Sequence, residues 1–91
     1  MSVQIRLPTV LRPHAGGQSV VEGDGSTVGE VLGNLVEANP GMKEQVLTSD
    51  GALHRFVNVY LNDDDVRYLD SLDTKVSNGD TISILPAVAG G

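Results

Sequence analysis

The chain ends in Gly90-Gly91, which leaves the terminal carboxylate unshielded by any side chain. Glycine has no Cβ, so such a terminus is thin and rotates freely. Its carboxylate can therefore pass through a channel too narrow for other residues and react there. We expect Gly91 to carry the reactive group. The residues before it would enter a partner's active site as an uncharged thread: Ala87, Val88, Ala89 and Gly90.

Few other side chains have the type or spacing of a reactive centre. The chain has no cysteine, so any sulfur chemistry must take place on another group. The two histidines, His14 and His54, are far apart in the sequence and are expected to be structural. The run Asp63-Asp64-Asp65 lacks the ligand spacing of a calcium loop and predicts a solvated turn. We therefore predict no catalytic residue and no metal ligand.

The charge balance restricts the kinds of partner. Six Lys and Arg residues against twelve Asp and Glu residues give a net charge of -6. This charge repels phosphate backbones and anionic membranes, and it suits a partner with a basic docking face. The N-terminus lacks the basic start and apolar run of a signal peptide, and no stretch approaches the roughly eighteen apolar residues of a membrane span. We expect a soluble cytoplasmic protein that binds neither nucleic acid nor membrane.

The elements that must position the tail begin with two strands. Alternating apolar and polar residues predict a first strand over about residues 2–7. A loop rich in proline and glycine over residues 8–17 leads to an extended segment at 18–22. Gly23-Asp24-Gly25 is expected to end that segment.

One main helix is predicted after these strands. Thr27 and Glu30 have the spacing of a capping box, and Asn39-Pro40-Gly41 ends the helix. Gly29 and Gly33 weaken it, and we expect them to permit close approach of the helix to the sheet. Its apolar face follows helical spacing: Val28, Val31, Leu32, Leu35 and Val36.

The second half of the chain predicts more strands. Residues 42–47 could add a short helical turn, residues 56–61 are rich in β-formers, and residues 65–68 can return as a short strand. A turn at Asn78-Gly79-Asp80 precedes a final strand at 81–85, which Pro86 ends. The inward strand residues would form the core with the helix: Ile5, Leu7, Val20, Val57, Val59, Ile82 and Ile84.

This order predicts an α+β domain at residues 1–86, in which a mixed sheet wraps over one main helix, and a flexible tail at 87–91. If Val57 and Val59 face the core, Phe56 and Tyr60 point outward. With Leu85 near the root of the tail, Phe56 and Tyr60 form a predicted docking surface for partners.

The strand and helix order and two sequence segments resemble the β-grasp, ubiquitin-like sulfur carriers of the ThiS/MoaD type. The first segment runs from Asn78-Gly79-Asp80 to Pro86 and the second is the terminal Val88-Ala89-Gly90-Gly91. Within that family, Leu11-Arg12-Pro13-His14 and the stretch from Leu53 to Asn58 look closest to the branch that serves cysteine biosynthesis in actinobacteria. The resemblance covers nearly the whole chain.

The resemblance implies a set of partners that carry out the chemistry. An E1-like adenylyltransferase and sulfurtransferase would use ATP and magnesium to convert Gly91 to an acyl-adenylate, and a sulfur donor would then replace AMP to give a thiocarboxylate. A PLP-dependent cysteine synthase would accept the sulfur, and a zinc metallopeptidase would release cysteine and regenerate the carrier. The PLP, zinc and magnesium would belong to these partners, so the resemblance implies that the carrier itself is not an enzyme and holds no cofactor.

Two alternatives require the same tail and fold. The chain could be a protein modifier that is attached through Gly91 to a lysine of a target. It could also be a sulfur carrier for molybdopterin or thiamine synthesis. The segment between the helix and the third strand is longer than in the thiamine-type carriers, which disfavours a role in thiamine synthesis.

Overall fold

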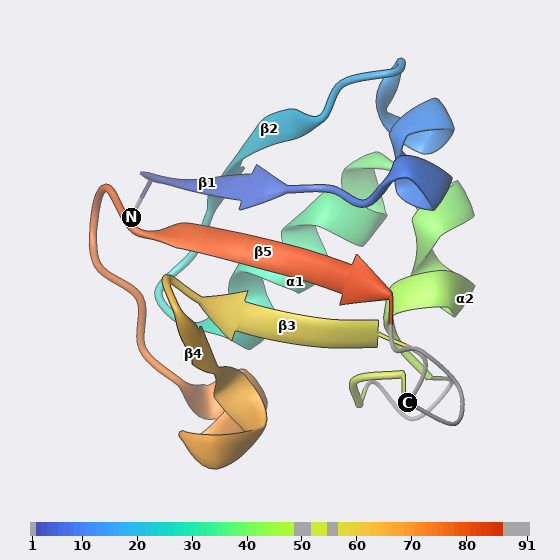
Figure 1. Cartoon of the computed structure of the whole chain (residues 1–91). Coiled ribbons are helices and arrows are strands. Elements are labelled where there is room, and N and C mark those ends of the chain that lie inside the picture. The colour runs from blue at the N-terminus through green and yellow to red at the C-terminus, as the bar shows by residue number, and fades with distance from the viewer. Residues whose placement is uncertain (1, 49–51, 55–56, 87–91) are drawn as a thin grey trace.

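A computed structural model describes residues 2–48, 52–54 and 57–86, and in this part of the chain a five-stranded mixed sheet packs on one main helix. The strand order is β2-β1-β5-β3-β4, and β1 and β5 form the parallel pair at the centre (Figure 1). The strands are β1 (Ser2–Arg6), β2 (Val20–Asp24), β3 (Val57–Leu61), β4 (Asp64–Asp65) and β5 (Thr81–Pro86). The helices are α1 (Val28–Ala38) and α2 (Lys43–Val46), with 3-10 segments η1 (Thr9–Ala15), η2 (Pro40–Met42), η3 (Val66–Tyr68) and η4 (Ser71–Asp73). The predicted α+β architecture is confirmed.

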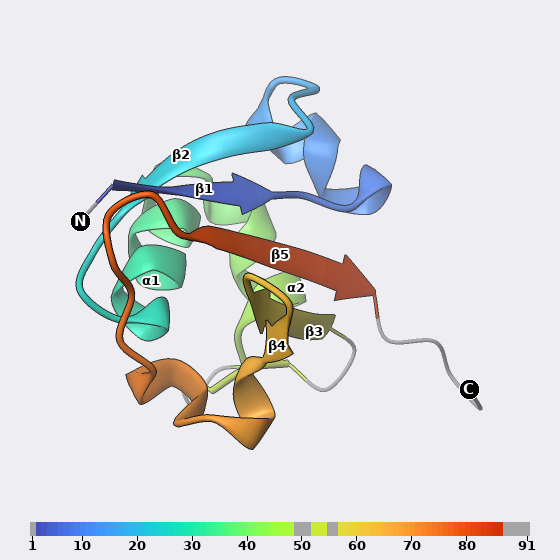
Figure 2. The same ribbon diagram turned by 60° about the vertical axis from the view of Figure 1, so that its left-hand side comes forward.

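The sheet turns one face to α1 and leaves the other face open, as Figures 1 and 2 show. Alternation along the strands sets which side chains are inside: Ile5 on β1, Val59 on β3 and Ile82 on β5 are almost wholly buried. Helix α1 contributes the whole predicted apolar face, and Leu11 and Met42 complete the core from η1 and η2. The core lies between the sheet and α1 because each element is apolar on one side only.

Val20 is an exception to the predicted core. It is 43% exposed on the open face, opposite Arg6, and Val21 packs against the core instead. The strand continues through Gly23, which was expected to break it. A Cβ at Gly23 would lie only 2.5 Å from Ile5 Cδ1, so glycine lets β2 pack closely over the core side chain of β1. Pairing with β1 therefore fixes the phase of β2, and the prediction for Val20 was wrong.

Helix α1 begins at the predicted cap. Thr27 Oγ1 accepts a hydrogen bond from the Glu30 backbone N–H at 3.1 Å. The Glu30 carboxylate accepts from the backbone N–H of Ser26 at 2.9 Å, one residue earlier than in the usual capping box. The helix ends at Asn39, as predicted.

Two loop predictions were also incomplete. Residues 9–15 form η1 rather than an irregular loop, because Leu11 is buried in the core and draws the segment over the sheet edge. Of the predicted return strand at 65–68, only Asp65 pairs with β3. The chain then turns into η3, where Asp65 caps the N–H of Arg67 at 2.9 Å.

The two helix glycines do not approach the sheet as predicted. A Cβ at Gly29 would lie 3.0 Å from the backbone oxygen of Leu72, so Gly29 accommodates η4. A Cβ at Gly33 would meet nothing within 4 Å. The expectation of close packing was therefore wrong for Gly33 and named the wrong neighbour for Gly29.

Replacing Gly33 with alanine is expected to stabilise the domain by about 0.5–1 kcal/mol. Alanine lowers the conformational entropy of the unfolded chain and favours helix, and the site has room for its methyl group. Urea unfolding of Gly33→Ala measures the gain, with Gly29→Ala as the matched control in which contact with Leu72 should remove it. A lower unfolding midpoint for Gly33→Ala than for the wild type would contradict this.

Candidate partner-docking face

The central strand β5 determines where the chain leaves the sheet. Because β1 and β5 are parallel, their carboxyl ends at Arg6 and Pro86 lie toward the same edge of the sheet (Figure 1). Pro86 is held from the other side by pairing with Val57. Three parts of the predicted site lie outside the described residues: Gly91, the tail residues 87–90 and Phe56. Their roles remain predictions. Strand β5 and the described chain end at Pro86, where the predicted tail would begin.

Two of the predicted docking residues come together on the open face. Tyr60 lies opposite Ser83, and Leu85 lies opposite Asn58 on the same pair of strands. Tyr60 and Leu85 are therefore diagonal neighbours, a spacing of about 7–8 Å between backbones that large side chains can span. Tyr60 is half-buried and Leu85 is 46% exposed. An apolar pair of this kind next to the root of the tail can contact a partner that binds the tail.

Arg67 fixes the strand beneath this pair, a role that the sequence did not predict. Its Nη2 donates to the Val57 carbonyl at 2.8 Å and to the His54 carbonyl at 3.2 Å. Its Nη1 donates to the Asn58 side-chain oxygen at 2.8 Å. A guanidinium can make three such bonds at once because its donors form a rigid fork. Arg67 thereby holds the side chain that lies opposite Leu85.

Both histidines make contacts within the domain. His14 Nε2 lies 3.1 Å from Gln45 Nε2, and its ring packs against Gly41. The backbone N–H of His54 donates to the Val46 carbonyl. Within residues 2–48, 52–54 and 57–86, no three His, Asp or Glu side chains are grouped so that they could hold a metal ion.

None of the helices in residues 2–48, 52–54 and 57–86 has the length and apolar character that crossing a membrane requires.

Comparisons with known proteins identify similar chains along the full length. A model of the ThiS family matches residues 5–91. The sulfur carrier protein CysO of Mycobacterium tuberculosis is 48% identical over 93 aligned positions, which cover 100% of this chain and 100% of that protein. Small archaeal modifier protein 3 of Haloferax volcanii is 33% identical over 93 aligned positions, again covering 100% of both.

A solved structure shares the fold. A chain of the crystal structure of the Amycolatopsis orientalis BexX/CysO complex superposes with a TM-score of 0.88 at 46% identity, covering 98% of this chain and 99% of that chain. The similarity confirms the predicted β-grasp fold.

Proposed function

The chain belongs to the ThiS family, and from this premise we propose that it is a sulfur carrier that donates sulfur for cysteine biosynthesis. The observation that carries the proposal is the 48% identity to CysO over the whole of both chains. The geometry is compatible with this role, because the described domain presents an open sheet face beside the root of the tail.

The proposed chemistry takes place at Gly91. A carboxylate is a poor acyl donor because its leaving group would be oxide, so it must first be activated. A carboxylate oxygen attacks the α-phosphorus of ATP, an O–P bond forms, and pyrophosphate leaves. A sulfur donor at the oxidation level of sulfide then attacks the Gly91 carbonyl carbon. A C–S bond forms and AMP departs, which leaves a thiocarboxylate whose sulfur is nucleophilic near neutral pH.

The five residues from Ala87 to Gly91 deliver this group. Fully extended, they reach roughly 17 Å beyond Pro86, at about 3.3–3.6 Å for each residue. We propose that they enter the partner's active site as a flexible thread while the domain at residues 1–86 stays outside. Phe56, Tyr60 and Leu85 would dock the partner and so limit the search that the tail must make.

All catalysis in this scheme belongs to the partners, which we place in the cytoplasm with the carrier. An E1-like adenylyltransferase and sulfurtransferase binds ATP and magnesium, a PLP-dependent cysteine synthase accepts the sulfur, and a zinc metallopeptidase releases the cysteine. The carrier contributes a reactive terminus and a docking surface. It would itself hold none of these cofactors.

A second candidate function is favoured by one comparison, the 33% identity to small archaeal modifier protein 3. In that case the activated Gly91 would be attacked by a lysine amine of a target protein instead of a sulfur donor. An isopeptide bond would form and AMP would leave. Activation at Gly91 is common to both functions, so the fate of the activated carbonyl distinguishes them.

The test follows the sulfur after activation. The thiocarboxylate form of the chain is incubated with a PLP-dependent cysteine synthase and O-phosphoserine, and its intact mass is measured. The carrier function predicts one cysteine added to Gly91, which a zinc metallopeptidase then removes. An unconsumed thiocarboxylate, together with ATP-dependent conjugates to lysines when the unmodified chain is incubated in cell extract, would favour the modifier.

A further inference from the structure

A groove lies at the sheet edge where the described chain ends. It has a volume of about 610 Å³ and extends from the carboxyl ends of β1 and β5 to η1 and the start of β2. Three apolar side chains on its walls are open to solvent: Val10 is 62% exposed, Val20 is 43% exposed and Leu85 is 46% exposed. Pro86, the last described residue, also lines the groove, so the predicted tail begins beside it.

The groove is positively charged although the chain is acidic. Among the described residues that line it, Arg6 and Arg12 are charged and none is acidic. Within the described part of the chain, these two guanidinium groups make one side-chain hydrogen bond, from Arg12 Nε to the Leu7 carbonyl at 3.3 Å. Each guanidinium has five N–H donors, so the described residues take up little of this donor capacity. Arginine forks of this kind match carboxylates in geometry and charge.

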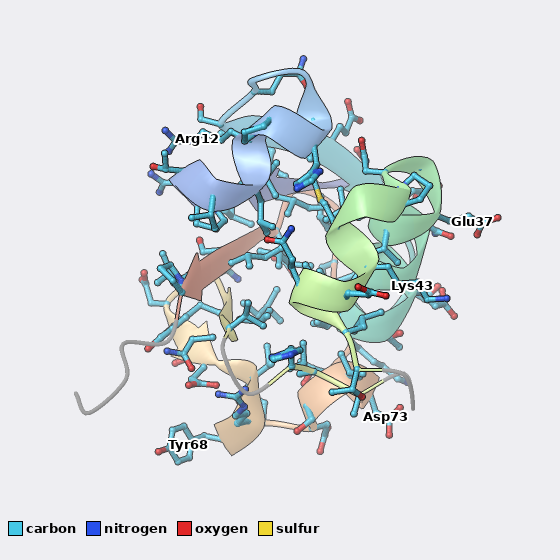
Figure 3. The ribbon with its side chains drawn as sticks, turned by 90° about the vertical axis from the view of Figure 1, so that its right-hand side faces the viewer. Arg12, Glu37, Lys43, Tyr68 and Asp73 are labelled. Carbon is cyan, nitrogen blue, oxygen red and sulfur yellow. The ribbon has the colours of Figure 1, made fainter. Side chains whose placement is uncertain are left out.

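Five of the twelve acidic residues gather on a different part of the molecule. Asp63, Asp64 and Asp65 lie at the turn into β4, Asp70 precedes η4 and Asp73 ends it. Figure 3 shows Arg12 at the opposite end of the molecule from Asp73. The groove and the acidic residues near η4 thus give the molecule a positive and a negative end. The net charge of -6 still repels extended polyanions and anionic membranes. The groove thus suits a ligand whose negative charge is confined to a short segment.

The backbone beside the groove also favours an extended ligand. The register of β1 with β5 ends at Arg6 and Ser83, while β3 remains paired with β5 up to Pro86. Leu85 is therefore paired with β3 on one side, and on the other side, beyond the end of its pairing with β1, it borders the groove. An extended segment can lie there with aliphatic side chains on Val10 and Leu85 and carboxylates toward Arg6 and Arg12.

We propose that this groove docks an acidic, extended segment of a partner protein, with carboxylates that pair with Arg6 and Arg12 and aliphatic side chains that cover Val10, Val20 and Leu85. The identity of that partner as a tail-receiving enzyme rests on the proposed function. The charge preference rests on the groove alone. The net charge of the whole chain predicts a partner with a basic docking face, whereas this groove favours a partner with an acidic segment.

The first test does not depend on any enzyme. The full chain, labelled with ¹⁵N, is titrated with a short synthetic peptide that carries two glutamates and two leucines in a glycine and serine background. We expect amide shifts at residues 6–12, 19–20 and 83–86. The same peptide with glutamine in place of glutamate should bind about tenfold more weakly, the effect of two partly exposed ion pairs. The Arg6→Glu/Arg12→Glu variant should no longer bind the glutamate peptide more tightly than the glutamine peptide.

Three results would overturn the proposal: equal binding of the two peptides, shifts centred on other residues, or the same shifts with inorganic phosphate at similar concentration. Because Arg12 also bonds the Leu7 carbonyl, Arg6→Glu alone is measured as a second variant that leaves this bond intact. Melting temperatures of both variants establish that they are folded.

The second test uses the adenylyltransferase and has a charge-matched control. Arg6→Glu/Arg12→Glu and Lys43→Glu/Lys75→Glu change the net charge by the same amount, but only the first pair lies in the groove. We expect the groove variant to raise the KM for the carrier about tenfold with little change in kcat, and the control to change KM less than about twofold. Equal effects would show a response to net charge and contradict the proposal. Failure of the wild-type chain to be adenylated would instead contradict the proposed function, and the peptide titration would still decide whether the groove selects acidic segments.

Discussion

Removal of Gly91 is expected to abolish activation of the chain by the adenylyltransferase. The truncation moves the terminal carboxylate back by about 3.3–3.6 Å, the length of one extended residue. Reaction at phosphorus requires the attacking oxygen within about 3–3.5 Å in the correct direction, and a 1 Å displacement alone can reduce the rate about 100-fold. ATP–pyrophosphate exchange should therefore fall at least about 100-fold.

Replacing Gly90 with valine tests the other requirement, a narrow and freely rotating thread. A β-branched side chain restricts the backbone and widens the segment next to the carboxylate, so exchange should fall to a similar degree. Val88→Ala is the matched control, since it keeps the length of the tail and removes bulk. The melting temperature of all three variants should match that of the wild type. Undiminished exchange by the truncated chain would show that Gly91 is not the activated residue.

Truncation of Tyr60 is expected to weaken partner binding tenfold or more. Tyr60 and Leu85 are diagonal neighbours on the open face beside the root of the tail, and aromatic side chains at such patches typically contribute about 1–4 kcal/mol to binding when truncated. The other tyrosine of the chain provides the control. Tyr68 is 88% exposed on η3, outside the paired strands β3 and β5 that carry Tyr60 and Leu85, so Tyr68→Ala should leave affinity unchanged.

Affinity and thermal stability must be measured on the same proteins, because Tyr60 is half-buried. Lost affinity with an unchanged melting temperature for Tyr60→Ala supports docking through this face. Wild-type affinity in a folded Tyr60→Ala protein would exclude Tyr60 from the docking surface. Phe56→Ala extends the test to the predicted residue outside the described structure: loss of stability would assign Phe56 to the core, and loss of affinity alone would assign it to the surface.

Local sequence signals predicted most of the fold. The cap at Thr27 and Glu30 and the alternation along β1, β3 and β5 depend on neighbouring residues, so the sequence contains them directly. The phase of β2 depends on pairing with β1 and on the contact of Gly23 with Ile5, which no local pattern specifies. The same holds for η1. Its composition is typical of a loop, but the burial of Leu11 in the core packs the segment against the domain as a 3-10 helix.

The candidate site shows a similar division. The carboxylate terminus and the outward position of Tyr60 could be inferred from residue type and strand alternation. The groove could not, since Arg6 and Leu85 meet there through the parallel pairing of β1 with β5, elements separated by most of the chain. The outward position of Arg6 on its strand was the one available signal. The role of Arg67 also arises only from the fold, because η3 brings it back to β3.

The central claim is that Gly91 becomes a thiocarboxylate, and intact-mass analysis of the chain tests this most directly. The full chain is incubated with the adenylyltransferase, ATP, magnesium and a sulfide donor, and the C-terminal peptide is then analysed. We predict a mass gain of one sulfur in place of one oxygen, located at Gly91, dependent on ATP and absent from the chain without Gly91. An unchanged C-terminal mass after complete turnover of ATP to AMP and pyrophosphate, or a sulfur gain at any other residue, would contradict the proposed function.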